Sequence, residues 1–364
     1  MNRLARTLAA VLLVVSLASG PAAVACTTFV LHDGQELVVG KNYDFCTDNG
    51  RVMTNQRGVS KHALLMGPGI PARWVSRYGS ITFNQVGKEY PIGGMNEAGL
   101  VVETMSVEAA SFPAPDDRPA LSELQWVQYQ LDNCATVGEV MATNAAIRIE
   151  RPGQPVHFLV ADRQGSVATV EFLAGQFVCH TGDSLLVPVL TNNTYEASAA
   201  YLCRHVGFGG SEPPAPSSAS LDRFTNAAVM LCGPAALHRG KPDQRAFQIL
   251  HAVAIPNYTV WSIVYDLPRG RIHFHTTADR TLRHVDLGDF EFDCARPGRL
   301  LDLATRCKGH AAGRFVDYTT ELNRALVRGT FVHYRDAKFI DLPAPVQEHL
   351  ARYPESLSCA PATP

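Results

Sequence analysis

Cys26 is the residue of this chain best placed for covalent chemistry, because it directly follows a segment with the pattern of a secretory signal peptide. Residues 1–25 combine two arginines, an apolar run over 8–17 and the small-residue ending Ala23-Val24-Ala25. Cleavage after Ala25 would leave Cys26 as the first residue, carrying both a thiol and a free α-amine. Such an amine has a pKa of roughly 7.7–8.0 and can accept and return a proton near neutral pH. One residue would then supply nucleophile and base without a separate histidine.

The position of Cys26 alone leaves two other interpretations open. A cysteine of an exported protein is most often half of a disulfide. A cysteine behind a leader can also be the lipidated residue of a bacterial lipoprotein, and the chain would then be a lipid-anchored, non-catalytic binding protein. Ala23 matches that lipidation pattern only loosely, because a large aliphatic residue usually stands there.

The composition is that of an ordinary globular enzyme. Of the 364 residues, 46% are hydrophobic and 18% are charged, and the net charge is −2. No block of basic residues stands out, which argues against nucleic-acid binding. Beyond the leader no apolar run reaches about 18 residues, so we expect no stable membrane span. We predict one domain over residues 26–342 and a loose, proline-rich arm over 343–364.

The cysteine count is odd. Nine cysteines follow the leader, so at least one thiol stays unpaired unless the chain is cross-linked to another chain. A free Cys26 with the other eight cysteines in up to four bridges would fit this count. The spacing does not predict which cysteines pair.

The elements that must position Cys26 begin with a β-hairpin. A strand over 27–31, the turn Asp33-Gly34 and a second strand over 37–40 would return residues 41–44 close to Cys26. The glycine-rich stretch 93–99 is predicted to be a turn.

Strands and helices alternate in groups along the rest of the chain. Further strands are predicted over 81–86, 100–105, 156–161, 167–172, 177–180, 186–190, 259–265 and 271–276. Helices are predicted after the capping pairs Ser122/Gln125 and Thr136/Glu139, and over 196–205, 221–231 and 243–253. This order favours a layered α+β fold with mostly antiparallel sheets.

Several short motifs follow Cys26 in a specific order. They are Cys26-Thr27-Thr28-Phe29, Gly40-Lys41-Asn42-Tyr43-Asp44, Met95-Asn96-Glu97-Ala98-Gly99-Leu100, Leu190-Thr191-Asn192, and Ser217-Ser218-Ala219-Ser220 leading to Arg223-Phe224. Each motif is weak alone, but the ordered set over about residues 26–290 resembles the choloylglycine hydrolase family. These linear-amide C–N hydrolases include bile salt hydrolases and penicillin V acylases. The resemblance implies an N-terminal-nucleophile hydrolase with a four-layer αββα sandwich.

The resemblance also implies residue roles. Cys26 would be the nucleophile, and its α-amine would move the proton. Asp44 would lie beside that amine and stabilise its charged form. Asn192 would donate a hydrogen bond to the oxyanion, and Arg223 would hold the cluster together.

Two positions depart from the family pattern. Lys41 stands where the family often has arginine; lysine keeps the charge that lowers a thiol pKa but lacks the planar fork of arginine. Ser106 stands where bile salt hydrolases carry an asparagine, and its shorter side chain donates one hydrogen bond. We therefore place bile-salt specificity in more doubt than amide hydrolysis, and a catalytically inactive relative remains an alternative.

No cofactor or metal is expected. His273 and His275 would share one face of a strand, but no compact set of further ligands accompanies them.

From the leader and the resemblance we expect an exported enzyme, periplasmic or extracellular in a bacterium, that hydrolyses a small-molecule acyl amide. Phenoxymethylpenicillin, conjugated bile salts and N-acyl homoserine lactones are the substrate types that the resemblance implies. We expect the acyl pocket in the loops 45–60 and 68–78. The sequence does not decide between a monomer and a homo-oligomer.

Overall fold

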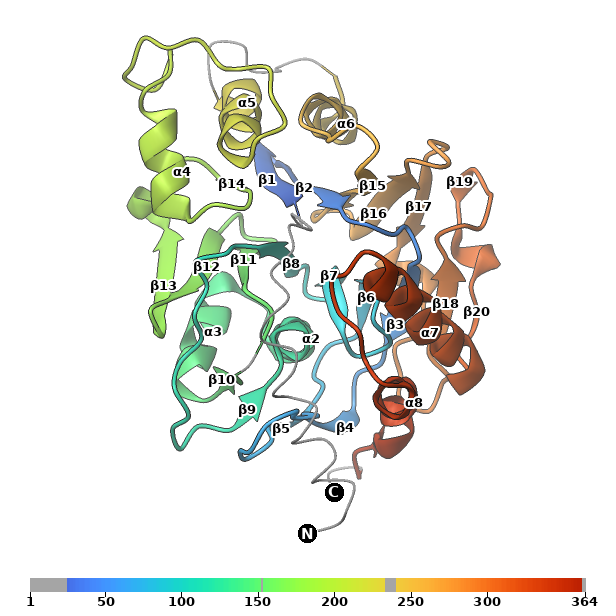
Figure 1. The fold of residues 1–364 in the computed structure, drawn as a ribbon. Coiled ribbons are helices and arrows are strands. Elements are labelled where there is room, and N and C mark those ends of the chain that lie inside the picture. The colour runs from blue at the N-terminus through green and yellow to red at the C-terminus, as the bar shows by residue number, and fades with distance from the viewer. Residues whose placement is uncertain (1–24, 152, 233–239, 362–364) are drawn as a thin grey trace.

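The computed structural model describes residues 25–151, 153–232 and 240–361. The predicted signal peptide, residues 1–25, therefore lies outside the described residues except for Ala25. Two large β-sheets face each other, and helices cover the outer face of each (Figure 1). This is the αββα sandwich that the sequence predicted.

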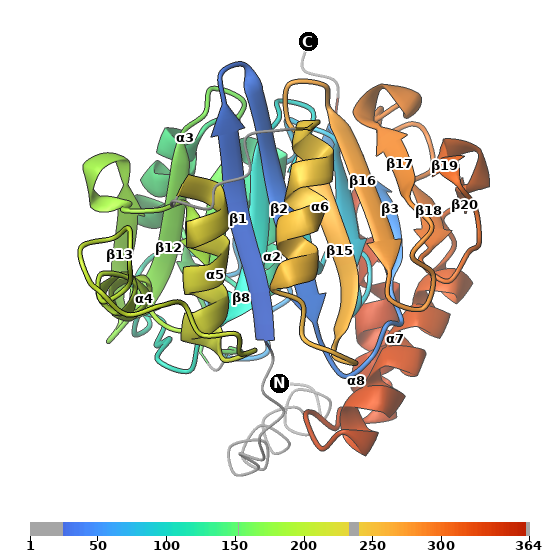
Figure 2. The same ribbon diagram turned by 90° about the horizontal axis from the view of Figure 1, so that it is seen from above.

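The first sheet, sheet A, contains the chain segment that begins at Ala25. Its strand order is β14 (Val189–Leu190), β1 (Ala25–Asp33), β2 (Glu36–Asp44), β15 (Thr259–Asp266), β16 (Arg271–Thr276), β17 (Arg283–Asp286) and β19 (Gly309–His310). All pairs are antiparallel except β17 with β19. Helices α5 (Ser220–Cys232) and α6 (Pro242–Ala252) lie over β1, β2 and β15 (Figure 2).

The second sheet, sheet B, has nine strands. Their order is β13 (Gln176–Thr181), β12 (Val167–Leu173), β11 (Val156–Ala161), β8 (Val101–Ser106), β7 (Pro91–Asn96), β6 (Ser80–Asn84), β3 (Arg51–Asn55), β18 (Arg299–Asp302) and β20 (Val316–Asp317). Helix α2 (Glu123–Asn133) packs on β7 and β8. The remaining helices and strands are α3 (Val137–Ala142), α4 (Tyr195–Leu202), α7 (Thr320–Asp336), α8 (Ala344–Arg352), β4 (Val59–His62), β5 (Arg73–Val75), β9 (Ala120–Leu121), β10 (Arg148–Ile149) and β21 (Ser358–Cys359).

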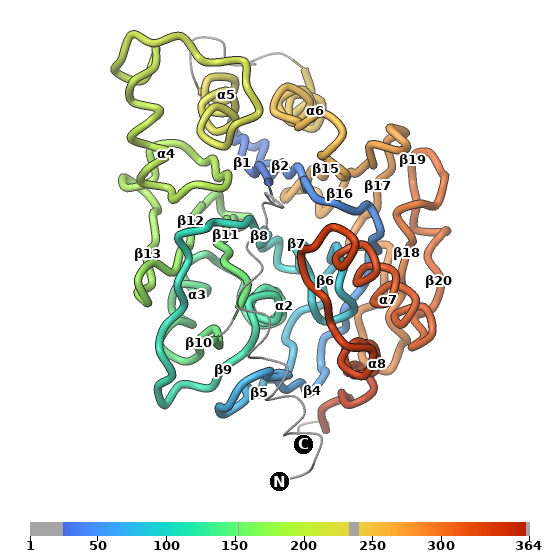
Figure 3. Tube along the Cα trace, viewed as in Figure 1, coloured from blue at the N-terminus to red at the C-terminus, as the bar shows by residue number. Residues whose placement is uncertain are grey.

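Strand β11 of sheet B carries apolar residues on both faces because each face is covered. On β11, Phe158 and Val160 pack with helix α2, whereas Leu159 packs into the core between the sheets. Side chains alternate across a strand, so one short run serves both layers. The course of the chain through the layers is clear in the Cα trace (Figure 3).

Most predicted elements are confirmed, with shifted ends. Thr136 and Glu139 form the expected capping box at α3. Ser122 caps α2, but the Gln125 side chain accepts from the Leu64 N–H, so that box is only half formed. The strand expected over 186–190 is limited to β14.

The turn predicted over 93–99 is wrong in its first half. Gly93 and Gly94 belong to strand β7, and the chain turns only after Asn96. Gly93 lies directly opposite Glu103, and a Cβ at Gly93 would meet the Glu103 carboxylate at 2.4 Å. The glycine is needed for this close approach across the sheet.

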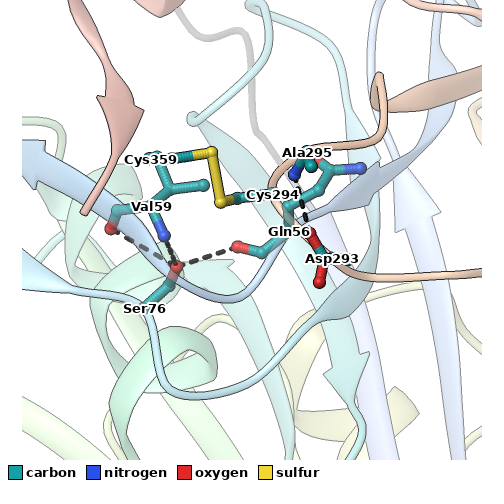
Figure 4. Close-up of a disulfide and its surroundings, with 7 residues drawn as sticks. All are labelled: Gln56, Val59, Ser76, Asp293, Cys294, Ala295 and Cys359. Atoms are coloured by element: carbon teal, nitrogen blue, oxygen red, sulfur yellow. Dashed lines mark hydrogen bonds between the residues drawn. A yellow bond between two sulfur atoms is a disulfide. The ribbon is translucent and has the colours of Figure 1, made fainter. Parts of the chain in front are cut away.

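The expectation of a loose C-terminal arm is also wrong. Pro343 and Pro345 lie at the start of α8, where proline does not break a helix. Strand β21 then pairs with β4, and Cys359 forms a disulfide with Cys294 (Figure 4). All nine cysteines are within the described residues, and this bridge is the single one formed, in place of the four that the count allowed.

The disulfide should stabilise the fold by closing a long loop. Cys294 and Cys359 are separated by 65 residues, so Cys359→Ser should lower the free energy of unfolding by about 2–4 kcal/mol. Urea unfolding of protein made under oxidising conditions measures this change. Cys203→Ser, which removes an exposed free cysteine, is the matched control. Equal urea midpoints for both variants would show that the bridge contributes nothing.

Candidate active site

The β1–β2 hairpin places Cys26, Lys41 and Asp44 together, as the sequence predicted. Cys26 pairs with Tyr43, Ala25 with Asp44, and Thr28 with Lys41. The Thr28 hydroxyl contacts the Met105 sulfur of β8, so this face of β1 points toward sheet B. Since side chains alternate, Cys26 and Lys41 also lie between the sheets, and Asp44 lies on the face covered by α5 and α6.

Arg223 joins the residues around Cys26. It lies on the first turn of α5 and is 2% exposed. Its Nη1 donates to the Cys26 carbonyl and the Thr27 hydroxyl, each at 2.6 Å, and its Nη2 donates to Asn192 Oδ1 at 2.6 Å. Nε donates to the Ser218 carbonyl at 3.0 Å. The planar guanidinium therefore fixes the main chain of Cys26 relative to Asn192.

Asn192 links both sheets to the nitrogen of Cys26. Its Oδ1 accepts from the Cys26 nitrogen at 2.9 Å, and its Nδ2 donates to the Ser106 carbonyl at 2.9 Å. The Asn192 N–H donates to the Ser220 hydroxyl at 2.9 Å. The described chain still carries Ala25, so the Cys26 nitrogen is a peptide N–H; an α-amine at the same place would meet the same acceptor.

Asp44 is a buried carboxylate with few partners. Its Oδ1 accepts from the Thr259 hydroxyl, and its Oδ2 lies 3.7 Å from Arg223 Nη1 without a hydrogen bond of its own. Burial raises the pKa of Asp44 to about 6, against the opposing charges of Arg223 and Lys41 and the Thr259 bond. A positive group arriving beside Asp44 would offset this cost.

The thiol of Cys26 is only 1% exposed. Burial raises its pKa, and the nearby Asp44 charge adds to this. Lys41, the Asp44 main-chain N–H and Arg223 act in the opposite direction, with Lys41 the strongest of the three. Positive charge therefore reaches the sulfur from both faces of sheet A.

Ser106 makes a different contact from the expected one, whereas the charge of Lys41 acts on the Cys26 thiol as expected. Ser106 contacts Asn192 through its main-chain carbonyl, so that bond does not depend on which side chain stands there. Lys41 is fully buried; it donates to the Thr104 carbonyl at 2.6 Å and the Met105 sulfur at 3.1 Å, and lies 3.5 Å from the Glu103 carboxylate.

Sequence reasoning missed a second set of buried polar residues. His157 contacts Glu171 at 2.9 Å and the Thr191 carbonyl at 2.8 Å, next to Asn192. These side chains alternate with apolar neighbours on strands, and such a pattern does not separate them from ordinary core positions. They hold the chain segment that carries Asn192 against sheet B.

A hollow of about 420 Å³ lies next to Asp44. Its lining includes Phe45, Tyr258, Thr259 and His333, and Thr259 is the residue that bonds Asp44. Cys26 is not in the lining. Burial raises the pKa of Tyr258 to about 12, and the charges of Cys46, Cys26 and Asp44 add to this. Of the loops expected to form the acyl pocket, residues 45–48 line the hollow, and 68–78 do not.

In the part of the chain that the structure describes, side chains that could bind a metal ion gather in one group. Oxygen or nitrogen atoms of Asp286, Asp289 and His310 lie within 4.8 Å of one another. Both carboxylate oxygens of Asp286 are bound by Arg271, at 2.6 and 2.8 Å. The arrangement is an exposed ion-pair network far along sheet A from Cys26.

The buried Asp44 should make stability depend on pH. Its folded pKa of about 6 exceeds the unfolded value of about 3.9, so the folded chain binds more protons between these values. Stability should therefore fall as pH rises through this window, by up to about 3 kcal/mol from this group. Asp44→Asn should lack that part of the decline, in urea unfolding from pH 4 to 7 of the chain that retains Ala25. Parallel pH profiles for the two proteins would contradict the assignment.

Comparison with known proteins agrees with this geometry. Residues 26–239 match the model of the linear amide C–N hydrolases, choloylglycine hydrolase family. Penicillin V acylase of Pectobacterium atrosepticum is 23% identical over 371 residues, which cover 86% of this chain and 96% of that protein.

Two solved structures share the fold. Penicillin V acylase from Agrobacterium tumefaciens has a TM-score of 0.71 and 24% identity, and covers 81% of this chain and 98% of its own. A mutant of conjugated bile acid hydrolase from Clostridium perfringens has a TM-score of 0.63 and 16% identity, with 78% and 98% covered. Because the family match begins at Cys26 and spans more than half of the sequence, the chain belongs to the choloylglycine hydrolase family of linear amide C–N hydrolases.

Proposed function

We propose that the mature protein is an N-terminal-cysteine amidase that hydrolyses an N-acyl amide through a thioester on Cys26. The observation that carries the proposal is the set of contacts at the Cys26 nitrogen. Asn192 Oδ1 accepts from that nitrogen, Arg223 binds the adjoining carbonyl, and the Asp44 carboxylate is buried beside the pair. These groups suit an α-ammonium better than a peptide N–H, because the ammonium would add positive charge beside Asp44, whose Oδ2 accepts no hydrogen bond.

The reaction would follow from this placement. The Cys26 thiolate attacks the acyl carbon, and a C–S bond forms while charge develops on the carbonyl oxygen. Asn192, with main-chain donors, is the proposed partner of that oxyanion. The α-ammonium then gives a proton to the amide nitrogen, the C–N bond breaks and the amine leaves.

The second half of the reaction returns the enzyme to its starting state. The neutral α-amine takes a proton from water, and the resulting hydroxide attacks the thioester carbon. The C–S bond breaks, the acid is released and the thiolate is restored with its neighbouring ammonium. No other proton carrier is required, since one amine both gives and takes the proton.

Lys41 and Ser106 do not argue against hydrolysis. Lys41 is already among the groups that lower the thiol pKa, so the charge of the expected arginine is retained. The bond from Asn192 to residue 106 goes to the main chain and survives the change to serine. A smaller side chain at 106 would alter the space around the substrate, which bears on acyl-group preference.

Among the family's substrates, we propose a penicillin V type acyl amide first. Support comes from the two penicillin V acylases described above, each of which is aligned over most of this chain. Conjugated bile salts and N-acyl homoserine lactones are the other amides to compare. The hollow lined by Phe45 and Tyr258 would accept an apolar or aromatic acyl group.

Export to the periplasm or the extracellular space is part of the proposal. It is supported by the leader pattern over residues 1–25 and by the disulfide, since such bridges persist in oxidising compartments. None of the helices in the described residues is long and apolar enough to cross a bilayer.

Replacing the nucleophile tests the mechanism. Cys26→Ala should reduce amide hydrolysis by a factor of about 10⁴ or more, because no thioester can form. The assay follows amine release from phenoxymethylpenicillin, glycocholate and an N-acyl homoserine lactone. Cys203→Ser, which removes an exposed thiol, should retain full activity.

Two results would overturn the proposal. One is a Cys26→Ala variant that keeps its activity. The other is a mature protein whose first residue, by mass spectrometry, is a lipidated cysteine and which hydrolyses none of the amides.

A further inference from the structure

Glu103 is a buried carboxylate next to the proposed catalytic cluster. The mechanism above gives it no role. It lies on β8 and is 1% exposed, and its side chain points into the space between the two sheets. Its Oε2 is 3.5 Å from Lys41 Nζ, and its Oε1 accepts from the Tyr265 hydroxyl at 2.5 Å. Burial raises the pKa of Glu103, while Lys41 and Tyr265 act to lower it.

Lys41 depends on this carboxylate. Its other two partners, the Thr104 carbonyl and the Met105 sulfur, carry no charge. Removing a lysine ammonium from water strongly disfavours its charged form, and an opposite charge within about 4–6 Å restores it. Glu103 is the carboxylate that forms an ion pair with Lys41.

The fold makes room for this ion pair. Gly93 lies opposite Glu103 on β7, and any Cβ there would come within 2.4 Å of the Glu103 carboxyl atoms. Buried ion pairs are costly and often contribute no net stability. Lys41 lies opposite Thr28 in the hairpin, on the same face as Cys26. Gly93 leaves room for an ion pair that need not stabilise the fold. We therefore expect the Lys41–Glu103 pair to have a role other than stability.

We infer that Glu103 is a positioning residue that holds the Lys41 side chain by an ion pair on the face of sheet A that carries Cys26, so that Lys41 can stabilise the thiolate of Cys26. The inference rests on the proposed role of Cys26 as the nucleophile. The charged groups that act on the Cys26 thiol are Lys41 and Asp44 on β2 and Arg223 on α5. Lys41 in turn pairs with Glu103 on β8, which also accepts from the Tyr265 hydroxyl on β15. Glu103 affects the Cys26 sulfur through its ion pair with Lys41.

The test is the pH dependence of alkylation at Cys26. Processed protein is treated with iodoacetamide, and the labelled peptide that begins at Cys26 is quantified by mass spectrometry, which separates it from the other free cysteines. Glu103→Gln keeps the size of the side chain and removes its charge. Lys41 is then no longer held by an ion pair on the Cys26 face of sheet A, so the thiolate should lose part of its stabilisation. The midpoint of alkylation should move to higher pH by about one unit.

Three variants sharpen this result. Glu103→Asp keeps the charge and should return the midpoint toward the wild-type value. Gly93→Ala, which displaces the carboxylate without changing any titratable group, should raise the midpoint. Glu89→Gln removes a carboxylate from another buried pair, Lys61–Glu89 at 2.6 Å, and should leave the midpoint unchanged.

The outcomes separate this inference from the proposed function. If Glu103→Gln alkylates with the wild-type midpoint, or with a lower one, the inference is wrong even when Cys26 is essential for hydrolysis. If Glu103→Gln does not fold, Gly93→Ala decides by the same criterion. If wild-type Cys26 is not alkylated and its loss leaves hydrolysis intact, the proposed function itself is wrong.

Discussion

The structure around Cys26 depends on one buried guanidinium. Arg223 reaches from helix α5 through the outer face of sheet A and binds the Cys26 carbonyl, the Thr27 hydroxyl and Asn192 Oδ1 at once. A buried arginine is costly unless its donors are paired, and here the pairs are the backbone and side chains that frame the reacting residue. Helix, hairpin and the segment after β14 are thereby held in one arrangement.

The sandwich architecture brings two ion pairs toward Cys26 from opposite faces of sheet A. Asp44 and Arg223 act from the helix-covered face of sheet A, and Lys41 with Glu103 acts from the space between the sheets. Strand alternation produces this division, because Lys41 and Asp44 are separated by an odd number of positions on β2 and so point to opposite faces. Each charge has a counter-charge on its own side, which limits the cost of burying these ionisable groups.

The sequence predicts the parts of the site that follow from local rules. The Asp33-Gly34 turn and the alternating strands on either side of it predict the hairpin, and with it the meeting of Cys26 and Asp44. Asn192 and Arg223 are identified through motif order, since no local pattern places them near Cys26. Glu103 escapes sequence reasoning, because its partner Lys41 is distant along the chain and contact across two sheets leaves no periodic signal.

Local rules fail where tertiary contacts decide the conformation. The local sequence predicts a turn at Gly93, yet this residue stays in β7 because Glu103 occupies the space of its missing side chain. Pro343 and Pro345 suggest a loose tail, but they begin α8, and the tail is bound by β21 and the Cys294–Cys359 bridge. At position 106 the sequence draws attention to the side chain, whereas the main-chain carbonyl makes the contact.

The most direct test of this account is to trap the intermediate during turnover. The mature protein is mixed with phenoxymethylpenicillin, quenched in acid within the first turnovers, and its N-terminal peptide is analysed by mass spectrometry. The account predicts a peptide that begins at Cys26 and carries one acyl group, which hydroxylamine removes as expected for a thioester. Sustained hydrolysis with no acyl group on that peptide, or a mature chain that begins at another residue, would contradict it.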